Sequence, residues 1–149
     1  MALKTVRFVS LFFTALALAP AMAHLLALPN KINLLREQYL IVQQIYRGWA
    51  FLGIIVIAAL LSTLVLTITV RNQPKTFALA LAAFLCIAGA QALFWTFTYP
   101  ANQQTDNWTI LPEHWPALRK QWEYSHAAGA GLNLVALVAL ILAVLGKDE

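Results

Sequence analysis

The residues of this chain best suited to chemistry are histidine and glutamate near the ends of long apolar stretches. His24 lies about one helical turn from the end of the first stretch, and His126 begins the last one, three residues after Glu123. Imidazole is a general base and a common metal ligand, so the pair indicates proton transfer or metal binding. Carboxylate-bridged dimetal sites use two Glu-x-x-His motifs, whereas this chain has one. We therefore predict no metal site and no cofactor, and a single haem or metal stays an alternative.

Other polar and aromatic side chains lie at the same ends of the apolar stretches. Steps of four, three and four residues predict one shared face of the third helix for Gln91, Trp95, Thr98 and Asn102. A second shared face is expected on the fourth helix for Arg119, Trp122, His126 and Asn133. Arg47 lies just before the second stretch, and Trp108 lies in the connection before the fourth.

The opposite halves of the stretches hold almost no polar groups. Residues 60–70, 77–90 and 134–145 contain only Ser, Thr and Cys as polar types, and Cys86 is expected to be a packing residue. This uneven distribution predicts a polar-aromatic pocket near one membrane surface. Simpler explanations stay open: the tryptophans form an interfacial belt, Gln91 and Asn133 link helices, and Arg119 and Glu123 form an ordinary ion pair.

The composition predicts that these residues are positioned by membrane-spanning helices. Hydrophobic residues make up 61% of the 149 residues and charged ones 11%, and the mean hydropathy is +0.71. Soluble domains are about 45–50% apolar and about 25% charged. Four stretches are long enough to cross a bilayer, at residues 8–28, 49–70, 77–99 and 126–145. Because lipid satisfies no backbone groups, we predict an all-α bundle of four transmembrane helices, forming a single domain over residues 1–149.

The connections predict further features at one surface. Residues 29–48 carry a helix-like apolar pattern, which indicates an interfacial helix or an extension of the second span. Residues 100–125 form a Trp-rich loop before the fourth helix. The first stretch resembles a signal peptide, with Ala21-Met22-Ala23 as a cleavage site, but its apolar character continues to Leu28. We expect this stretch to be retained.

Charge suggests an orientation and a set of partners. The basic N-terminus and the tight turn from Arg71 to Lys75 favour cytoplasmic termini in a multi-pass protein of the cell (inner) membrane. The net charge of +4 comes from scattered Lys and Arg, so we expect lipid headgroups rather than nucleic acid as partners. A small aromatic or apolar ligand, a second copy of the chain and a larger membrane subunit are the other partners considered.

One segment resembles a known family. It reads Thr98-Tyr99-Pro100-Ala101-Asn102, then Trp108, then Trp115-Pro116-Ala117-Leu118-Arg119-Lys120-Gln121-Trp122, then His126. This pattern is similar to the anthrone oxygenase-like family of small four-helix membrane proteins, most of which have no assigned function. Members often carry Arg three residues after the histidine, where this chain has Gly129.

The resemblance implies a cofactor-independent oxygenase of phenolic, anthrone-like substrates. His126 would be the base, oriented by Glu123 or His24, and Arg119 and Asn102 would stabilise the enolate. The remaining residues of the expected site would bind substrate: Trp122, Trp108, Trp95, His24, Gln91 and Arg47. Two other function classes stay open, a non-catalytic accessory subunit or small-molecule binder, and a haem or metal electron carrier.

Overall fold

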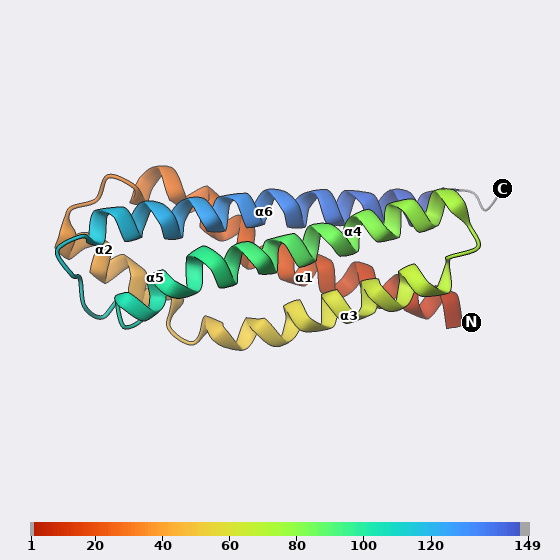
Figure 1. Cartoon of the computed structure of the whole chain (residues 1–149), viewed down its shortest axis with the longest axis horizontal. Helices are drawn as coiled ribbons and strands as arrows, with labels where there is room; N and C mark the ends of the chain where they lie inside the picture. The colour runs from red at the N-terminus through yellow and green to blue at the C-terminus, as the bar shows by residue number, and fades with distance from the viewer. Residues whose placement is uncertain (1, 147–149) are drawn as a thin grey trace.

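The chain is built from four long apolar helical segments (Figure 1). The computed structural model describes residues 2–146, so Lys147, part of the C-terminus expected in the cytoplasm, and Met1 lie outside the described residues. The first segment is α1 (Ala2–Lys31). The second consists of the short helix η2 (Trp49–Leu52) followed directly by α3 (Gly53–Thr69). The third joins α4 (Pro74–Leu93), η3 (Phe94–Thr98) and α5 (Tyr99–Gln104), and the fourth is α6 (Trp115–Leu145).

Each segment is long and apolar enough to cross a membrane, and the described residues include no strand. The predicted all-α, four-span membrane bundle is therefore confirmed. Three of the four segments extend beyond the predicted spans, most clearly α6, which begins at Trp115 instead of residue 126, while the second keeps within its predicted bounds. Apolar runs mark only the part of a helix that lies in hydrocarbon, so a helix that continues into the interface is longer than its run.

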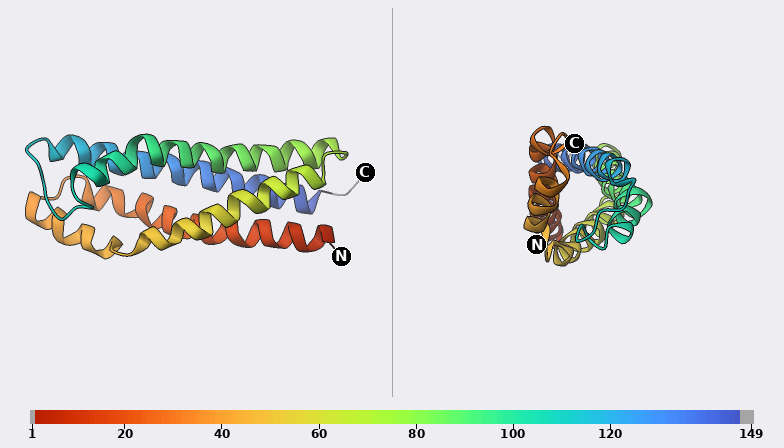
Figure 2. Two further views of the ribbon diagram at one scale, coloured as in Figure 1. Left: turned by 60° about the horizontal axis from the view of Figure 1, so that its bottom comes forward. Right: turned by 90° about the vertical axis from the view of Figure 1, so that its left-hand side faces the viewer.

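The four helices form a closed ring when the bundle is viewed along its axis (Figure 2). In ring order, α1 packs against α3, α3 against α4, α4 against α6, and α6 against α1. One end of the bundle carries both long connections, and we call it the loop end (Figure 1). The other end, where α1 begins, α6 ends and residues 70–73 turn between α3 and α4, is the terminal end.

Small residues allow the helices to approach closely in the terminal half. The buried core there contains Ala59, Ala80, Ala83 and Ala136 beside larger side chains such as Leu140. Without a hydrophobic driving force between helices in lipid, such close packing is a main source of association. Hydroxyl groups supply the remaining links, as where the Ser10 hydroxyl donates to the Ser62 carbonyl over 2.9 Å.

The connection between α1 and η2 contains a separate short helix and not an extension of the second span. This helix is α2 (Arg36–Gln43), followed by the short helix η1 (Gln44–Tyr46). It buries Tyr39 and Gln43 and exposes Ile41, so one face turns toward the bundle. Gly48 then takes a left-handed backbone conformation, with φ of 85°, before η2 begins.

The connection between α5 and α6 is shaped by three consecutive left-handed residues. Asp106, Asn107 and Trp108 have φ values of 44°, 54° and 63°. Asp and Asn adopt the left-handed backbone conformation readily. For Trp108 this conformation costs free energy, which other contacts of the residue must offset. The Thr105 hydroxyl accepts a hydrogen bond from the Trp108 backbone N–H at 3.1 Å, and the Trp108 ring is buried. The turn therefore directs Trp108 into the bundle.

Candidate functional site

A buried ion pair joins the end of α1 to α6 at the loop end. The Lys31 ammonium lies 2.9 Å from Oε1 of Glu123, and the two side chains are only 3% and 0% exposed. Taking two charges out of water is costly, and their attraction offsets this cost only when further hydrogen bonds are made. The surrounding residues supply such bonds.

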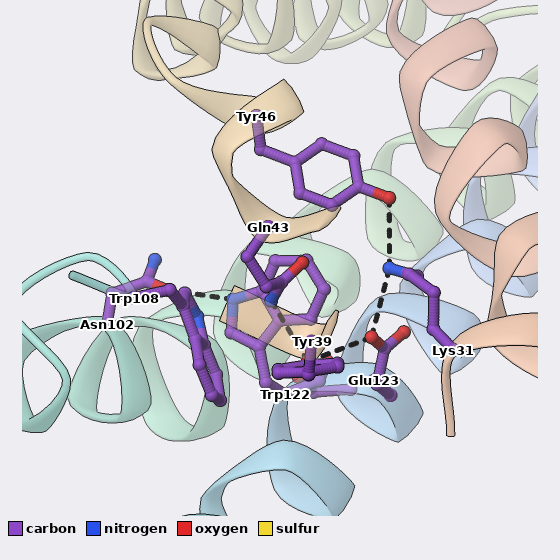
Figure 3. A network of polar contacts seen from close by, with 9 residues as sticks. Lys31, Tyr39, Gln43, Tyr46, Asn102, Trp108, Trp122 and Glu123 are labelled. Atoms are coloured by element: carbon purple, nitrogen blue, oxygen red, sulfur yellow. Dashed lines mark hydrogen bonds and ion pairs between the residues drawn. The ribbon is translucent and has the colours of Figure 1, made fainter. Parts of the chain in front are cut away.

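Two tyrosines and a glutamine extend the ion pair into a hydrogen-bond network (Figure 3). Lys31 Nζ donates to the Tyr46 hydroxyl over 2.9 Å, and the Tyr39 hydroxyl donates to Glu123 Oε1 over 2.9 Å. Gln43 Nε2 in turn donates to the Tyr39 oxygen over 2.9 Å. Burial, and then the negative charge of Glu123, raises the pKa of Tyr39 above its ordinary value, so this phenol remains a neutral donor. The network ties α1, α2 and η1 to α6.

Two histidine rings stack on each other next to this network. The ring centroids of His24 and His126 are 4.1 Å apart and the planes differ by 19°. Trp122 meets both rings, with centroids 5.0 Å from His24 and 4.3 Å from His126. Tyr46 and Trp49 pack on His24, with centroids at 4.3 and 5.4 Å. The two imidazoles are therefore held inside an aromatic cage.

The Lys31 ammonium borders the same cage. It lies 4.7 Å from the Tyr46 ring centroid and 4.9 Å from the Trp122 ring centroid, both within the range of a cation–π contact. Three buried atoms of these residues have no hydrogen-bond partner among the described residues: Nδ1 of His24, Oε1 of Gln43 and Oε2 of Glu123. The cage therefore combines imidazole, ammonium and carboxylate with unused hydrogen-bonding capacity.

Asn102 fixes two tryptophans of the site. Its Oδ1 accepts hydrogen bonds from Nε1 of Trp122 over 2.8 Å and from Nε1 of Trp108 over 3.1 Å. The two indoles meet edge to face, with centroids 5.9 Å apart. Asn102 therefore positions the Trp122 ring that covers both histidines.

We call this group of residues the loop-end cluster. It comprises His24, Lys31, Tyr39, Gln43, Tyr46, Trp49, Asn102, Trp108, Trp122, Glu123 and His126.

Arg119 lies against the first connection. Its guanidinium donates to the Leu34 carbonyl over 2.7 Å and lies over the rings of Trp115 and Tyr39, with its carbon 4.6 and 5.4 Å from their centroids. The described residues contain no ion pair between Arg119 and Glu123, so that simpler explanation is wrong. Glu123 pairs with Lys31 because α1 and α6 are neighbours in the ring.

The predicted shared face of the third helix is wrong for Trp95. The segment η3 is a π-helix, which accommodates an extra residue and shifts the side chains that follow. Trp95 is 60% exposed and packs on Phe94 and Tyr99, while Thr98 is buried and its hydroxyl lies 2.6 Å from that of Ser125. Trp95 is therefore directed away from the loop-end cluster.

Within residues 2–146, two more residues of the expected site make no hydrogen bond, ion pair or cation–π contact with the cluster. Arg47 is exposed and donates to Oε1 of Gln44 over 2.7 Å. Gln91 is half-buried in α4, and within residues 2–146 its side chain makes no hydrogen bond.

Sequence reasoning missed five members of the site: Lys31, Tyr39, Gln43, Tyr46 and Trp49. The sequence did contain a signal for Lys31, which follows His24 by seven residues and so falls on the same helical face two turns later. Glu123 and His126 share a face of α6 in the same way. Tyr39 and Tyr46 belong to the apolar pattern of residues 29–48, and nothing in that pattern indicates that Tyr39 donates to Glu123 or that Tyr46 accepts from Lys31.

The cage is filled by its own aromatic rings. Two open grooves, of about 320 and 370 Å³, are lined instead by residues from the terminal end, such as Thr5 and Lys4. The sequence predicted an open pocket at the loop end, whereas the rings there are in mutual contact. A ligand of the cage would therefore have to displace a ring.

Metal binding finds little support in the arrangement of the side chains. Among residues 2–146, no three His, Cys, Asp or Glu side chains are grouped so as to hold a metal ion. The stacked rings of His24 and His126 also do not present nitrogens to opposite sides of one iron, as two axial haem ligands must.

No protein-family model, no curated protein and no solved structure matches this chain.

Proposed function

We propose that the loop-end cluster binds a flat, weakly acidic aromatic molecule and removes a proton from it, and that the protein is a cofactor-independent oxygenase of phenolic, anthrone-like substrates. The observation that carries this proposal is the stacked pair of His24 and His126 inside an aromatic cage bordered by Lys31. The resemblance of the segment from Thr98 to His126 to anthrone oxygenase-like proteins agrees with this chemistry.

The proposed reaction needs a base, and the histidine pair supplies it. Anthrone has an acidic C–H opposite its carbonyl, and loss of that proton gives an electron-rich anion that transfers electrons to O₂. Oxygen then adds at the same carbon to give a hydroperoxide, which eliminates water to leave the quinone. In total, anthrone and O₂ give anthraquinone and water. An imidazole within the cage takes the first proton and can return it to the leaving oxygen.

Lys31 takes the role of the cation that the sequence assigned to Arg119. Its ammonium borders the rings that contact His24, whereas Arg119 is held by the Leu34 carbonyl and the Trp115 ring. A fixed positive charge in a water-poor site stabilises an anion as it develops, and Glu123 holds this charge in place. Asn102 then acts by positioning Trp122, because its Oδ1 is occupied by two indoles.

Substrate reaches the cage when Tyr46 and Trp49 move aside. Tyr46 belongs to the short helix η1 and Trp49 begins η2, at the start of the second long segment, so Gly48 lies between them. A flat ligand that replaces these two rings would stack on His24 in their place and would lie within reach of Lys31.

Turnover by purified protein tests the proposal. Protein in mild detergent is mixed with anthrone in air, and quinone formation is followed by absorbance. We expect His126→Ala to lower the rate at least about 100-fold, the usual range for losing a general base. His114→Ala is the matched control, because the His114 side chain is exposed and, within residues 2–146, hydrogen-bonds to Gln104 alone. Equal rates for wild type and His126→Ala would overturn the proposal.

A second candidate is binding without turnover. It is favoured by the filling of the cage with rings, which makes a stable aromatic-lined cluster in the absence of any substrate. Quenching of tryptophan fluorescence by anthraquinone, lost in Trp122→Ala and kept in Trp95→Ala, together with no quinone formation from anthrone, would support this alternative.

A further inference from the structure

Tyr46 places a phenol inside the loop-end cluster. Its ring packs on the His24 imidazole, with centroids 4.3 Å apart, and on the Trp122 indole at 5.6 Å. Its hydroxyl points toward the Lys31 ammonium and accepts a hydrogen bond from Nζ over 2.9 Å (Figure 3). Ring packing and a hydrogen bond from an ammonium are also the contacts that would hold a free hydroxylated ring. Tyr46 therefore occupies the cluster in the way that such a ligand would.

The residues around the Tyr46 ring belong to the long helices. His24 and Lys31 lie on α1, and Trp122 lies on α6 with its indole buried. The second oxygen at Lys31 Nζ, Oε1 of Glu123 at 2.9 Å, is also carried by α6. These groups would therefore keep their places if the Tyr46 ring left the cage.

Tyr46 itself lies in the connection between α1 and η2. It ends η1, a single turn of three residues, and its side chain is only half-buried. Gly48, two residues later, has a φ of 85°, and a Cβ built there meets nothing within 4 Å. Because glycine adopts many backbone conformations, the connection can turn at Gly48 and carry Tyr46 out of the cage while α1 and α6 stay in place.

We propose that Tyr46 is an internal ligand of the cage, and that the cage takes a hydroxylated aromatic ring in its place. Departure of Tyr46 removes one of the two oxygens from Lys31, and a ligand oxygen restores that hydrogen bond while its ring stacks on His24. A ring without an oxygen leaves the buried ammonium one hydrogen bond short. Lys31 therefore selects oxygen-bearing aromatics over hydrocarbons of the same shape. The inference rests on the ligand site of the proposed function but not on turnover.

Removing the Tyr46 ring and returning it as a free molecule tests the proposal. p-Cresol has the structure of a tyrosine side chain, and toluene has the same shape without the hydroxyl. Full-length Tyr46→Ala in mild detergent is titrated with each compound, and the apparent affinity is taken from the rise in melting temperature. We expect p-cresol to bind roughly ten- to hundredfold more tightly than toluene, the range for a hydrogen bond to a charged group.

Two proteins with an intact Tyr46 serve as controls. Tyr124→Ala removes an exposed ring of α6 that lies outside the loop-end cluster. p-Cresol should stabilise neither this variant nor wild type, because the Tyr46 ring fills the cage in both. Equal affinity of Tyr46→Ala for the two compounds, or equal stabilisation of Tyr46→Ala and Tyr124→Ala by p-cresol, would overturn the proposal. Preferential p-cresol binding by Tyr46→Ala, with no quinone formation from anthrone by wild type, would support it and contradict the oxygenase proposal alone.

Tyr46→Phe decides the question if Tyr46→Ala does not fold. Its ring keeps the packing on His24 and Trp122 but no longer accepts from Lys31. 1-Naphthol displaces this ring without breaking a hydrogen bond and makes a new one to Lys31, so it should bind Tyr46→Phe roughly tenfold or more tightly than wild type. Tyr124→Phe is the matched control and should bind 1-naphthol like wild type. Equal affinity of Tyr46→Phe and wild type for 1-naphthol would contradict the assigned role of Tyr46.

Discussion

The Lys31 ammonium at the end of α1 lies 2.9 Å from Oε1 of Glu123 on α6, with both side chains almost fully buried. The pair joins two helices that are neighbours in the ring, and it brings a positive charge beside the histidine cage. Its stability contribution and its chemical role can be tested separately.

Removing one member of the pair should strongly destabilise the protein. Glu123→Gln leaves the Lys31 ammonium buried without its counter-charge, which typically costs about 3–5 kcal/mol. The free energy of unfolding is measured by SDS titration of protein in mild detergent. Glu113→Gln, at an exposed position, is the matched control and should stay within about 0.5 kcal/mol of wild type.

Replacing both members should recover part of this loss. In Lys31→Met/Glu123→Leu no buried charge is left unpaired, so its free energy of unfolding should lie closer to wild type than that of Glu123→Gln. A Glu123→Gln variant as stable as wild type would show that the pair is not sheltered from water.

Asn102 should be replaceable only by a residue that keeps its acceptor. Asn102→Leu leaves the Trp108 and Trp122 indole N–H groups without their acceptor, which costs about 1–3 kcal/mol for each buried group, and should shift tryptophan emission to the red. Asn102→Asp keeps an acceptor oxygen and should preserve the emission maximum. Asn72→Ala, at an exposed position in the α3–α4 turn, serves as control. Similar emission from the Leu and Asp variants would contradict the assigned hydrogen bonds.

Gly48 and Gly53 should respond in opposite directions to alanine. A Cβ at either position meets nothing within 4 Å, so the backbone alone decides. Gly48 has a φ of 85°, where alanine costs roughly 1–2 kcal/mol, whereas Gly53 is helical with a φ of −54° and should gain about 0.5–1 kcal/mol. The free energies of unfolding check this. A stabilising Gly48→Ala would mean that the backbone there is not left-handed.

Tyr39 should make the stability of the protein fall at alkaline pH. Burial and Glu123 raise its pKa in the folded state above the ordinary value of 10.0, so the folded state holds a proton that the unfolded state releases. The stabilisation that comes from the protonated Tyr39 hydroxyl is fully present below about pH 10 and is lost as the pH rises further. In the folded protein at pH 11, wild type and Tyr39→Phe should show equal tyrosinate absorbance. A smaller signal from Tyr39→Phe would show that Tyr39 ionises with the others.

The sequence predicted the four spans and the helix α2 because both follow from the spacing of apolar residues. It also brought His24 and His126 to the same depth, since each lies near the same end of its apolar stretch. It could not predict that α1 and α6 are neighbours, because the apolar stretches show which segments are helices but not which helices pack against each other. Glu123 was therefore matched with Arg119 on its own helix instead of with Lys31.

Local backbone irregularity explains the error at Trp95. A regular α-helix carries residues four, three and four apart along one face, and the π-helix over Phe94–Thr98 breaks this rule within that interval. No proline or glycine lies within Phe94–Thr98 to signal the change. Asn102, beyond the irregular turn, still reaches the cluster and contacts both indoles.

Deprotonation of substrate in the absence of oxygen tests the central claim most directly. Anthrone is incubated under nitrogen in deuterated buffer with detergent-solubilised protein, and loss of the proton signal at its acidic carbon is followed by NMR. Wild type and His114→Ala should accelerate the exchange above the rate in detergent alone. His126→Ala should not accelerate it, and a cooperative unfolding transition in SDS titration shows that this variant is folded. Equal exchange with wild type and His126→Ala would contradict the assignment of the histidine cage as a proton-abstracting site.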